Sequence, residues 1–377
     1  MYSKRREETA KFVIQNKLKK DFWSRFYGLL VYKQKKDKIS EDEVKQLQQG
    51  LQEQGLVSKA ESSDRKHYLS IIASDRKPGK NQRFVPVLLL LLTIVTTTIT
   101  GAQLLNKDPF ASWENFFSGI YYAYALLLIL FCHEMGHYLY ARYYKIKVTL
   151  PFFIPFYFPL MFSFGTFGAF IRLKEPIPHK KALFDIGVAG PFAGFIVSVI
   201  FLILGFANLP DETGMWAYIN NIHPVTENVS GALTFGNNIL FDFFAQAFGK
   251  SYLPMYEMYH FPFIVTGWFG LLITALNLMP IGQLDGGHIT HAMFGGKSAR
   301  IAILGFLGLI ILNIVLISQF NSYVYVLWPI LILVFIKFKH PPTLDDSIPI
   351  GATRKFLGYI AYLIFVLCFS PMPIYLQ

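Results

Sequence analysis

The feature that most limits the fold is a set of apolar stretches long enough to cross a lipid bilayer. A membrane-spanning helix needs about 20 mostly apolar residues, and seven stretches of the chain approach or exceed that length. They lie near residues 85–105, 116–141, 182–207, 262–284, 300–318, 322–338 and 355–371. The chain is 53% hydrophobic and 16% charged, whereas a soluble domain carries about 25% charged residues. We therefore predict an all-α polytopic membrane protein with about 6–7 transmembrane helices.

A further apolar stretch, residues 150–174, is not typical of a straight helix. Pro151, Pro155 and Pro159 recur every four residues, and proline inside a helix removes a backbone hydrogen bond. The following "FSFGTFGAFI" is rich in Phe and Gly, which favours extended backbone. Non-helical backbone survives at membrane depth only where protein or a cavity surrounds it. We predict a membrane re-entrant β-hairpin.

Residues 1–84 are polar and form a separate N-terminal region, which we expect to be a small cytosolic α or α+β unit. Residues 3–32 favour an amphipathic helix at the membrane interface, residues 39–55 a capped helix, and residues 67–74 a short strand. More than half of the 35 Lys and Arg lie before residue 85. Nucleic-acid binding would explain this charge less well than cytoplasmic flanks of membrane spans do, so we expect no nucleic-acid partner.

The distribution of basic residues also predicts a topology. The segments near 142–147, 173–181, 297–300 and 337–340 are basic, whereas loop 208–261 holds one Lys against several acids. The positive-inside rule then places the N-terminus in the cytoplasm, loop 208–261 outside and, with seven spans, the C-terminus outside. The first apolar run starts too far along the chain for a cleavable signal peptide. Cys132 and Cys368 both lie in apolar runs and indicate no disulfide framework.

A metal-binding pattern lies at the end of the second apolar stretch, in "FCHEMGHYLYAR". Residues i and i+4 share one face of a helix, so His133 and His137 can reach the same ion while Glu134 points near it. Two imidazoles with an adjacent glutamate suit zinc, with Glu134 taking a proton from bound water. The alternative is a set of polar side chains satisfied by neighbouring helices. Ionisable residues inside a span are costly and indicate function by default, so the metal is the better explanation.

A catalytic zinc site needs a third protein ligand, and the best candidate is Asp285 in "NLMPIGQLDGGHITHAM". Asp285 ends the fourth apolar stretch and, like His137, lies a few residues before cytoplasmic basic residues. Pro280 and Gly282 are expected to interrupt the helix and turn the carboxylate inward. The alternative is that Asp285 is a helix-end or turn residue in water.

The motifs together resemble the site-2 protease family of intramembrane zinc metalloproteases. That family pairs "HEMGH" with a distant motif like "NLMPIGQLDGG", and "FGTFGAF" and "DIGVAGPFAG" resemble its re-entrant strand and the helix start that follows. The resemblance covers roughly 116–300. It implies His133, His137 and Asp285 as ligands of Zn²⁺ and Glu134 as catalytic base. It also implies Asn277 as a substrate-binding residue, a polar group near the reacting carbonyl or the substrate backbone. A PDZ-like insert and a nucleotide-binding C-terminal pair of domains, both common in the family, are not evident in the sequence.

The resemblance also implies how a substrate is held. The re-entrant strand would offer an open edge to an extended substrate, as in β-augmentation, with Gly165, Thr166, Phe167 and Gly168 as substrate-binding residues. The alternative is that these glycines only pack against a helix. Gly187, Gly190 and Gly194 form a small-residue face on the third span, which favours close helix packing.

From these motifs we expect an intramembrane zinc metalloendopeptidase that hydrolyses peptide bonds within transmembrane segments near the cytoplasmic face. Its partners would be single-span membrane protein substrates and the lipid bilayer, and its location a bacterial cytoplasmic membrane as an integral multi-pass protein. The expected division is 1–84 (cytosolic region), 85–114 (first helix and loop), 115–300 (catalytic membrane core) and 301–377 (C-terminal helices). A catalytically silent pseudoprotease that binds membrane helices, and a metal or proton transporter, remain as alternatives. His223 and His260 have no partner that the sequence identifies.

Overall fold

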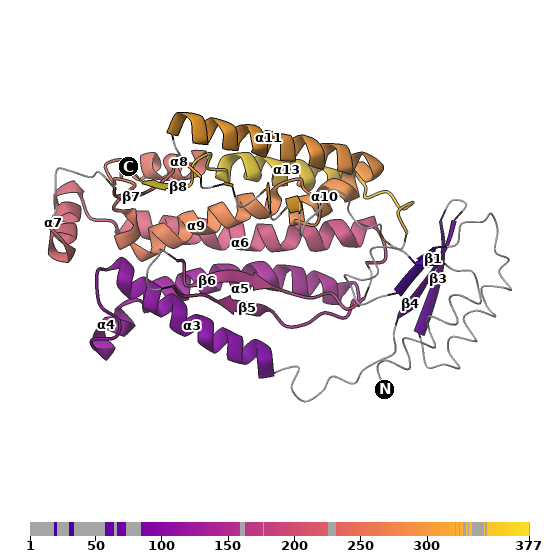
Figure 1. Cartoon of the computed structure of the whole chain (residues 1–377), viewed down its shortest axis with the longest axis horizontal. Helices are drawn as coiled ribbons and strands as arrows, with labels where there is room; N and C mark the ends of the chain where they lie inside the picture. Colours follow the sequence, from indigo (N-terminus) through magenta and orange to yellow (C-terminus); the bar gives the residue numbers. More distant parts are fainter. Residues whose placement is uncertain are drawn as a thin grey trace.

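The computed structural model describes four short N-terminal strands and most of the chain from residue 84 onward. The described residues are 19–20, 30–33, 57–63, 66–72 and 84–376, without 159–162, 176, 225–230, 321, 324, 327–328, 331, 334–342 and 344. This part of the chain is mostly helical, and its long helices run side by side in a bundle (Figure 1).

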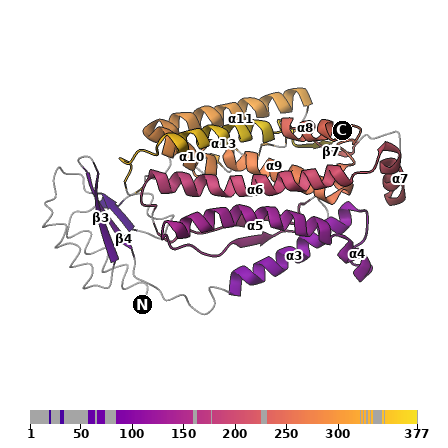
Figure 2. The same ribbon diagram turned by 180° about the vertical axis from the view of Figure 1, so that it is seen from behind.

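The centre of the bundle is α6 (Lys180–Asn208), which packs against α5 (Ile120–Tyr143) on one side and α9 (Pro262–Leu278) on the other. α3 (Phe84–Leu104) lies outside α5, and α11 (Ser298–Phe320) and α13 (Ala352–Cys368) cover the opposite side, as both views show (Figures 1 and 2). The largest fully buried side chains include Trp268, Tyr122, Phe184 and Phe206. They come from α5, α6 and α9 and belong to one hydrophobic core, which also includes residues of other elements.

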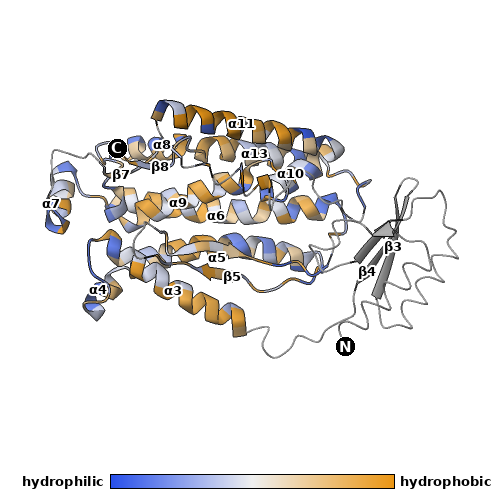
Figure 3. Ribbon diagram, viewed as in Figure 1, coloured by the Kyte–Doolittle hydropathy of each residue, from blue (hydrophilic) through white to orange (hydrophobic). Residues whose placement is uncertain are grey.

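Three described helical runs are long and apolar enough to cross a membrane: Phe84–Leu104, Lys180–Asn208 and Asp285–Phe320, while Pro262–Leu278 is apolar but shorter. Their apolar residues face outward as well as inward (Figure 3): Leu304 is 68% exposed and Ile311 62% exposed. The mostly helical, membrane-type fold is thus as expected. The count of six or seven spans stays a prediction, because residues 334–338 of the sixth stretch lie outside the described residues and α5 is less apolar than the others.

The described part of residues 150–174 contains two paired strands and no helix. β5 (Phe152–Pro155) and β6 (Thr166–Phe170) pair antiparallel, with a register shift between Phe153 and Pro155. The strand pair lies along α3, where the Thr96 hydroxyl donates to the Gly165 carbonyl oxygen at 2.7 Å. Gly165 has φ +79°, and a Cβ there would lie 2.6 Å from Thr97 Cα, so only glycine fits. Whether this strand pair enters a membrane stays a prediction.

Between α9 and α10 (Asp285–Phe294) the chain breaks in a tight turn. The expectation that Asp285 ends the fourth span was wrong, because α9 ends at Leu278 and Asp285 is the first residue of a separate helix. Pro280 cannot continue the helix, and Gly282 adopts φ +55°. This break brings the start of α10 back against the end of α9. A Cβ on Gly286 would lie only 2.0 Å from the Leu278 carbonyl oxygen.

Short elements gather at the end of the bundle remote from α10. They are α4 (Trp113–Ser118), α7 (Glu212–Ile222), β7 (Leu233–Phe235), α8 (Ile239–Ala247), η3 (Met258–His260) and β8 (Ile374–Leu376). β7 pairs antiparallel with β8, so the C-terminal strand lies beside loop 208–261. Figure 1 shows α4 and α7 at this end.

The N-terminal region contains a four-stranded antiparallel sheet in the order β1-β2-β4-β3. The strands are β1 (Lys19–Lys20), β2 (Leu30–Lys33), β3 (Val57–Ser63) and β4 (Lys66–Ile72). The helix predicted over 3–32 was wrong at β1 and β2, because cross-strand pairing is not visible in local periodicity. The strand predicted at 67–74 is confirmed by β4, and the helix predicted at 39–55 lies outside the described residues.

Candidate metal centre

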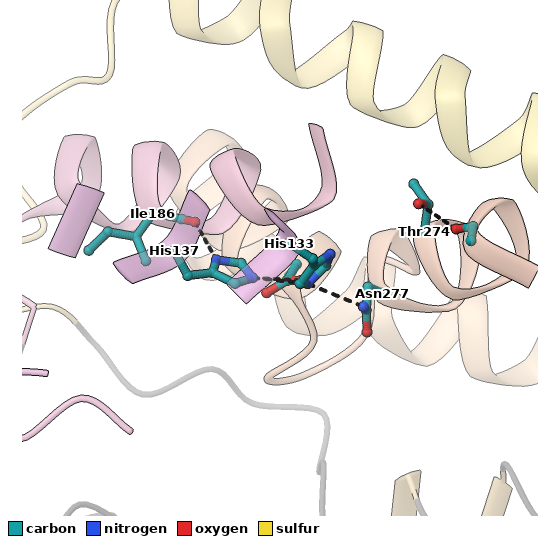
Figure 4. Close-up of polar contacts among 7 residues, drawn as sticks. His133, His137, Ile186, Thr274 and Asn277 are labelled. Atoms are coloured by element: carbon teal, nitrogen blue, oxygen red, sulfur yellow. Dashed lines mark hydrogen bonds and ion pairs between the residues drawn. The ribbon is translucent and has the colours of Figure 1, made fainter. Parts of the chain in front are cut away.

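The H-E-x-x-H residues lie on one buried face of α5, toward the end that precedes the basic segment 142–147. The exposed fractions of His133, Glu134 and His137 are 4%, 7% and 7%. His133 and His137 are one helical turn apart, and their rings meet edge to face with centroids 4.8 Å apart. Figure 4 shows the two imidazoles pointing toward one another and toward the end of α9. The spacing predicted from the sequence is therefore realised on a helix.

Asp285 joins the two histidines from α10 and completes a cluster of three ligand atoms. Asp285 Oδ2 lies 3.3 Å from His133 Nε2 and 3.3 Å from His137 Nε2, and the two Nε2 atoms are 3.1 Å apart. Ligand atoms about 2.0–2.1 Å from a tetrahedral zinc ion are separated by about 3.3 Å. The cluster thus has the size of one face of a zinc coordination tetrahedron.

The hydrogen bonding of His137 supports metal binding. Its Nδ1 lies 2.7 Å from the carbonyl oxygen of Ile186 in α6, and because a carbonyl only accepts, Nδ1 carries the proton. A neutral imidazole then directs the Nε2 lone pair at the Asp285 carboxylate, and two acceptors repel unless a cation lies between them. Such a second partner on the other ring nitrogen is typical of metal-binding histidines. The donor set therefore fits Zn²⁺.

The glycine face of α6 brings the ligands together. A Cβ on Gly187 would lie 2.9 Å from His288 Cβ, one on Gly190 would lie 2.1 Å from His137 Nε2, and one on Gly194 would lie 3.2 Å from His133 Nδ1. Gly136 on α5 is equally close to Ala189 of α6, at 2.4 Å. The small residues allow close helix packing, as predicted, and two of them, Gly190 and Gly194, pack directly against the histidines of the metal site.

Asn277 and Glu134 are the polar groups beside the three ligands. Asn277, near the end of α9, has its Nδ2 atom 3.4 Å from His133 Nε2 (Figure 4). The hydroxyl of Thr274, one turn earlier on α9, donates a hydrogen bond to the Gly270 carbonyl oxygen at 2.8 Å. The Glu134 carboxylate interacts with the backbone N–H of Ile171, the residue after β6. The site thus draws residues from α5, α9 and α10 and has the end of β6 beside it.

The four predicted substrate-binding residues of the strand pair are not equivalent. Gly165 and Thr166 are buried, and Thr166 Oγ1 donates to the Ile154 oxygen of β5 at 2.8 Å. Phe167 is 67% exposed, and a Cβ on Gly168 would meet no atom of the described residues within 4 Å. Gly165 and Thr166 therefore hold the strands to α3 and to each other, whereas Phe167 and Gly168 lie on the open surface. The substrate-binding role of all four stays a prediction.

The arrangement suits hydrolysis of a carbonyl compound. A zinc ion held by His133, His137 and Asp285 would lower the pKa of a bound water and polarise a carbonyl oxygen. Glu134, on the same helix face, is placed to take a proton and return it to a leaving amine. The Asn277 amide offers N–H donors to an oxygen that gains negative charge.

A second group of His and Glu side chains lies elsewhere in the structure. His223, Glu257 and His260 have ligand atoms within 4.8 Å of one another. Sequence reasoning left both histidines without a partner. The spacing of Glu257 and His260, three residues apart, was the one local signal, since residues i and i+3 share a face of a helical turn.

Comparison with known proteins agrees with this geometry. The sequence model of peptidase family M50 matches residues 121–314. The proteins named probable zinc metalloprotease EGY1, chloroplastic, are 30% identical over 250 residues in Oryza sativa subsp. japonica and 30% identical over 253 residues in Arabidopsis thaliana. The aligned regions cover 66% of this chain but 40% and 42% of those relatives. Probable zinc metalloprotease EGY2, chloroplastic, of Oryza sativa subsp. indica is 32% identical over 225 residues, 58% of this chain and 38% of the relative.

No solved structure gives a significant match. The chain spans about two fifths of the length of the curated relatives it matches. The family match covers half of the chain and includes every residue of the metal centre. The resemblance to the intramembrane zinc metalloproteases is confirmed: this chain belongs to peptidase family M50.

Proposed function

We propose that the protein is an intramembrane zinc metalloendopeptidase that cleaves transmembrane segments of single-span membrane proteins near the cytoplasmic face. The observation that carries the proposal is the convergence of His133, His137 and Asp285 beside Glu134, inside a bundle whose outer helices are apolar. The relatives are named zinc metalloproteases, and their activity supports the same assignment here.

Substrate handling in this proposal depends on β6. A transmembrane helix hides its peptide bonds because its backbone is already hydrogen-bonded, so it must be extended before it is cut. Within the described residues β6 pairs with β5 alone, which leaves one edge for an added strand. The backbone N–H of Ile171 next to Glu134 connects that edge to the proposed base. A substrate strand on β6 would therefore continue directly into the site.

The test is Glu134→Gln in the full chain, reconstituted with a fluorescently tagged single-span peptide. The exchange keeps the size of the side chain and removes the base, so cleavage should fall by about 10²–10⁴-fold while bound zinc and thermal stability are kept. Glu114→Gln, the same change on an exposed residue of α4, is the matched control and should leave cleavage unchanged. Full cleavage by Glu134→Gln would exclude the proposal, and zinc binding without any cleavage by the wild type would favour the pseudoprotease.

We further propose a bacterial cytoplasmic membrane as the location, with the N-terminus in the cytoplasm, although the relatives are named chloroplastic. The excess of basic residues in the N-terminal region supports this orientation. In a background without Cys132 and Cys368, a membrane-impermeant maleimide should label Asp108→Cys in intact cells. It should label Lys297→Cys only after lysis. The reverse pattern would overturn the orientation.

A further inference from the structure

We propose that His223, Glu257 and His260 form a second site for a divalent cation of the zinc class, at the opposite end of α9 from the first. Asn277, near the end of α9, approaches His133, whereas His260 lies two residues before the start of α9 at Pro262. With 17 residues at 1.5 Å per residue, α9 separates the two sites by about 25 Å. The proposal does not depend on the protease activity.

The second cluster has the dimensions of the first. His223 Nε2 and His260 Nε2 are 2.9 Å apart, and Glu257 Oε2 lies 3.3 Å and 3.2 Å from them. These lengths are close to the edge of about 3.3 Å expected for ligands of tetrahedral zinc. Two imidazoles and one carboxylate, with one coordination position left for water, form a common zinc ligand set.

The hydrogen bonds around the rings leave three acceptors facing one another. His260 Nδ1 lies 2.7 Å from the Leu104 carbonyl oxygen, and His223 Nδ1 lies 3.2 Å from the Pro224 oxygen. Both Nδ1 atoms are therefore donors, and in neutral rings both Nε2 atoms are acceptors. They point at the Glu257 carboxylate, which accepts as well. One added proton could bridge only one pair of these acceptor atoms, whereas a cation could bind all three.

Burial makes the arrangement costly without a cation. Glu257 is 6% exposed and His260 1% exposed, and Glu257 Oε2 has no hydrogen-bond partner among the residues that the structure describes. A buried carboxylate without compensation is strongly unfavourable. His223 keeps 27% of its side chain exposed, which leaves a path by which a hydrated ion can enter. The unsatisfied oxygen thus points to a ligand in addition to the spacing of the three residues.

The site would join three segments that are distant in sequence. His223 caps the end of α7, Glu257 and His260 precede α9, and the His260 ring is fastened to the last residue of α3, Leu104. Asn106 Nδ2 also donates to the Ile222 oxygen at 3.3 Å, so α7 and the end of α3 are already close. We therefore assign the ion a structural role, fastening α7 to the ends of α3 and α9.

The experiment measures metal in the full chain, purified in detergent, after the first site has been removed. Wild type should hold about two zinc ions per chain, and His133→Ala/His137→Ala about one. Adding His223→Ala to that double variant should abolish the remaining zinc. Adding Asn221→Ala instead, at an exposed residue of α7 near His223, should leave the remaining zinc bound. If the double variant does not fold, His223→Ala and Glu257→Gln alone should each lose about one zinc ion from an otherwise intact protein.

Cobalt gives a readout that is independent of activity and of zinc lost during purification. Co²⁺ added at micromolar concentration to the His133→Ala/His137→Ala variant should give visible d–d bands of four-coordinate geometry, and these should disappear with His223→Ala. Zinc should also raise the melting temperature of the double variant, and a chelator should reverse the rise. If that variant binds neither Co²⁺ nor Zn²⁺ under these conditions, protonated side chains rather than a cation stabilise the cluster, and the proposal is overturned.

Discussion

Gly190 of α6 lies directly against the imidazole of His137, so that a methyl group at residue 190 would come within 2.1 Å of Nε2. On the other edge of the same ring, Nδ1 donates a hydrogen bond to the carbonyl oxygen of Ile186, which lies one turn earlier on α6. α6 therefore both orients the ring and leaves room for it. α6 supplies no metal ligand, yet its packing decides whether His137 can reach the metal.

Gly190→Ala should consequently remove metal from the first site. The added Cβ would have to displace the His137 ring, because α6 and α5 are closely packed on both sides of the contact. Metal analysis should show a loss of about one zinc ion per chain, together with loss of cleavage. Gly308→Ala on α11, where a Cβ would meet no atom of the described part of the chain within 4 Å, should keep both the zinc content and the cleavage activity. Normal zinc content in a folded Gly190→Ala protein would contradict the packing described here.

Gly165, just before β6, and Gly168, within β6, provide a matched pair next to the site. Both have positive φ, +79° and +97°, but only the Cβ of residue 165 would collide with α3, whereas that of residue 168 would meet open space. Alanine at either position costs about 1–3 kcal/mol of backbone strain, and Gly165→Ala adds the clash. Gly165→Ala should therefore lower the melting temperature more than Gly168→Ala. Equal effects would show that α3 does not hold the strand.

Arg354 fastens α13 to the start of α6. Its Nε and Nη2 donate to the two carboxylate oxygens of Asp185, each at 2.8 Å, and the Tyr144 hydroxyl donates to the same carboxylate at 2.5 Å. Hydrogen bonds to a charged group contribute about 1.5–3 kcal/mol, so Arg354→Ala should lower the melting temperature by several degrees. The melting temperature of Arg354→Lys should lie between those of the wild type and Arg354→Ala, because Lys keeps the charge but lacks the planar fork of the guanidinium group. Lys355→Ala, an exposed neighbour, should have no effect.

The contact between Asp346 and His291 should make stability depend on acid pH. Burial raises the pKa of Asp346, but the nearby His291 imidazole and the hydrogen bond from the Thr343 hydroxyl outweigh it and hold that pKa below its usual range. A carboxyl whose pKa is lower in the folded state stabilises above its unfolded pKa of about 3.9 and loses this contribution as pH falls through the folded pKa.

Asp346→Asn should therefore lower the melting temperature at pH 7, and the difference from wild type should shrink below about pH 4. His291→Gln removes the other partner, with its Nε2 atom 3.5 Å from Asp346 Oδ2, and should show the same trend. A difference that stays constant from pH 7 to pH 3 would mean that the carboxylate charge is not what stabilises this contact.

Local spacing was sufficient to predict the α5 part of the site. His133, Glu134 and His137 lie within one and a half turns of a single helix, and helical periodicity alone puts the two histidines on one face. The same holds for the glycine face of α6, because a period of three to four residues is a property of one helix. The strand pair β5–β6 was equally accessible, since proline and glycine exclude a straight helix there.

Interactions between distant segments were harder to predict. Asp285 was expected near the histidines, yet its place at the start of α10 was missed, because a hydropathy run does not show where the chain folds back at Met279–Leu284. The strands β1 and β2 were mistaken for part of a helix for a similar reason. Strand pairing joins Tyr32 to Leu69 and Lys33 to Tyr68, and no window of neighbouring residues contains both partners.

By itself, the sequence determined a membrane-type helical chain, a His-Glu-His face on one helix and a separate carboxylate motif, because apolar length and helical period are local properties. The tertiary structure decided which glycines touch the ligands, that Asn277 approaches His133, and that His223 meets Glu257 and His260 at the far end of α9. These contacts join residues from about 34 to 144 positions apart. They depend on how helices pack in space, which no pattern along a single segment contains.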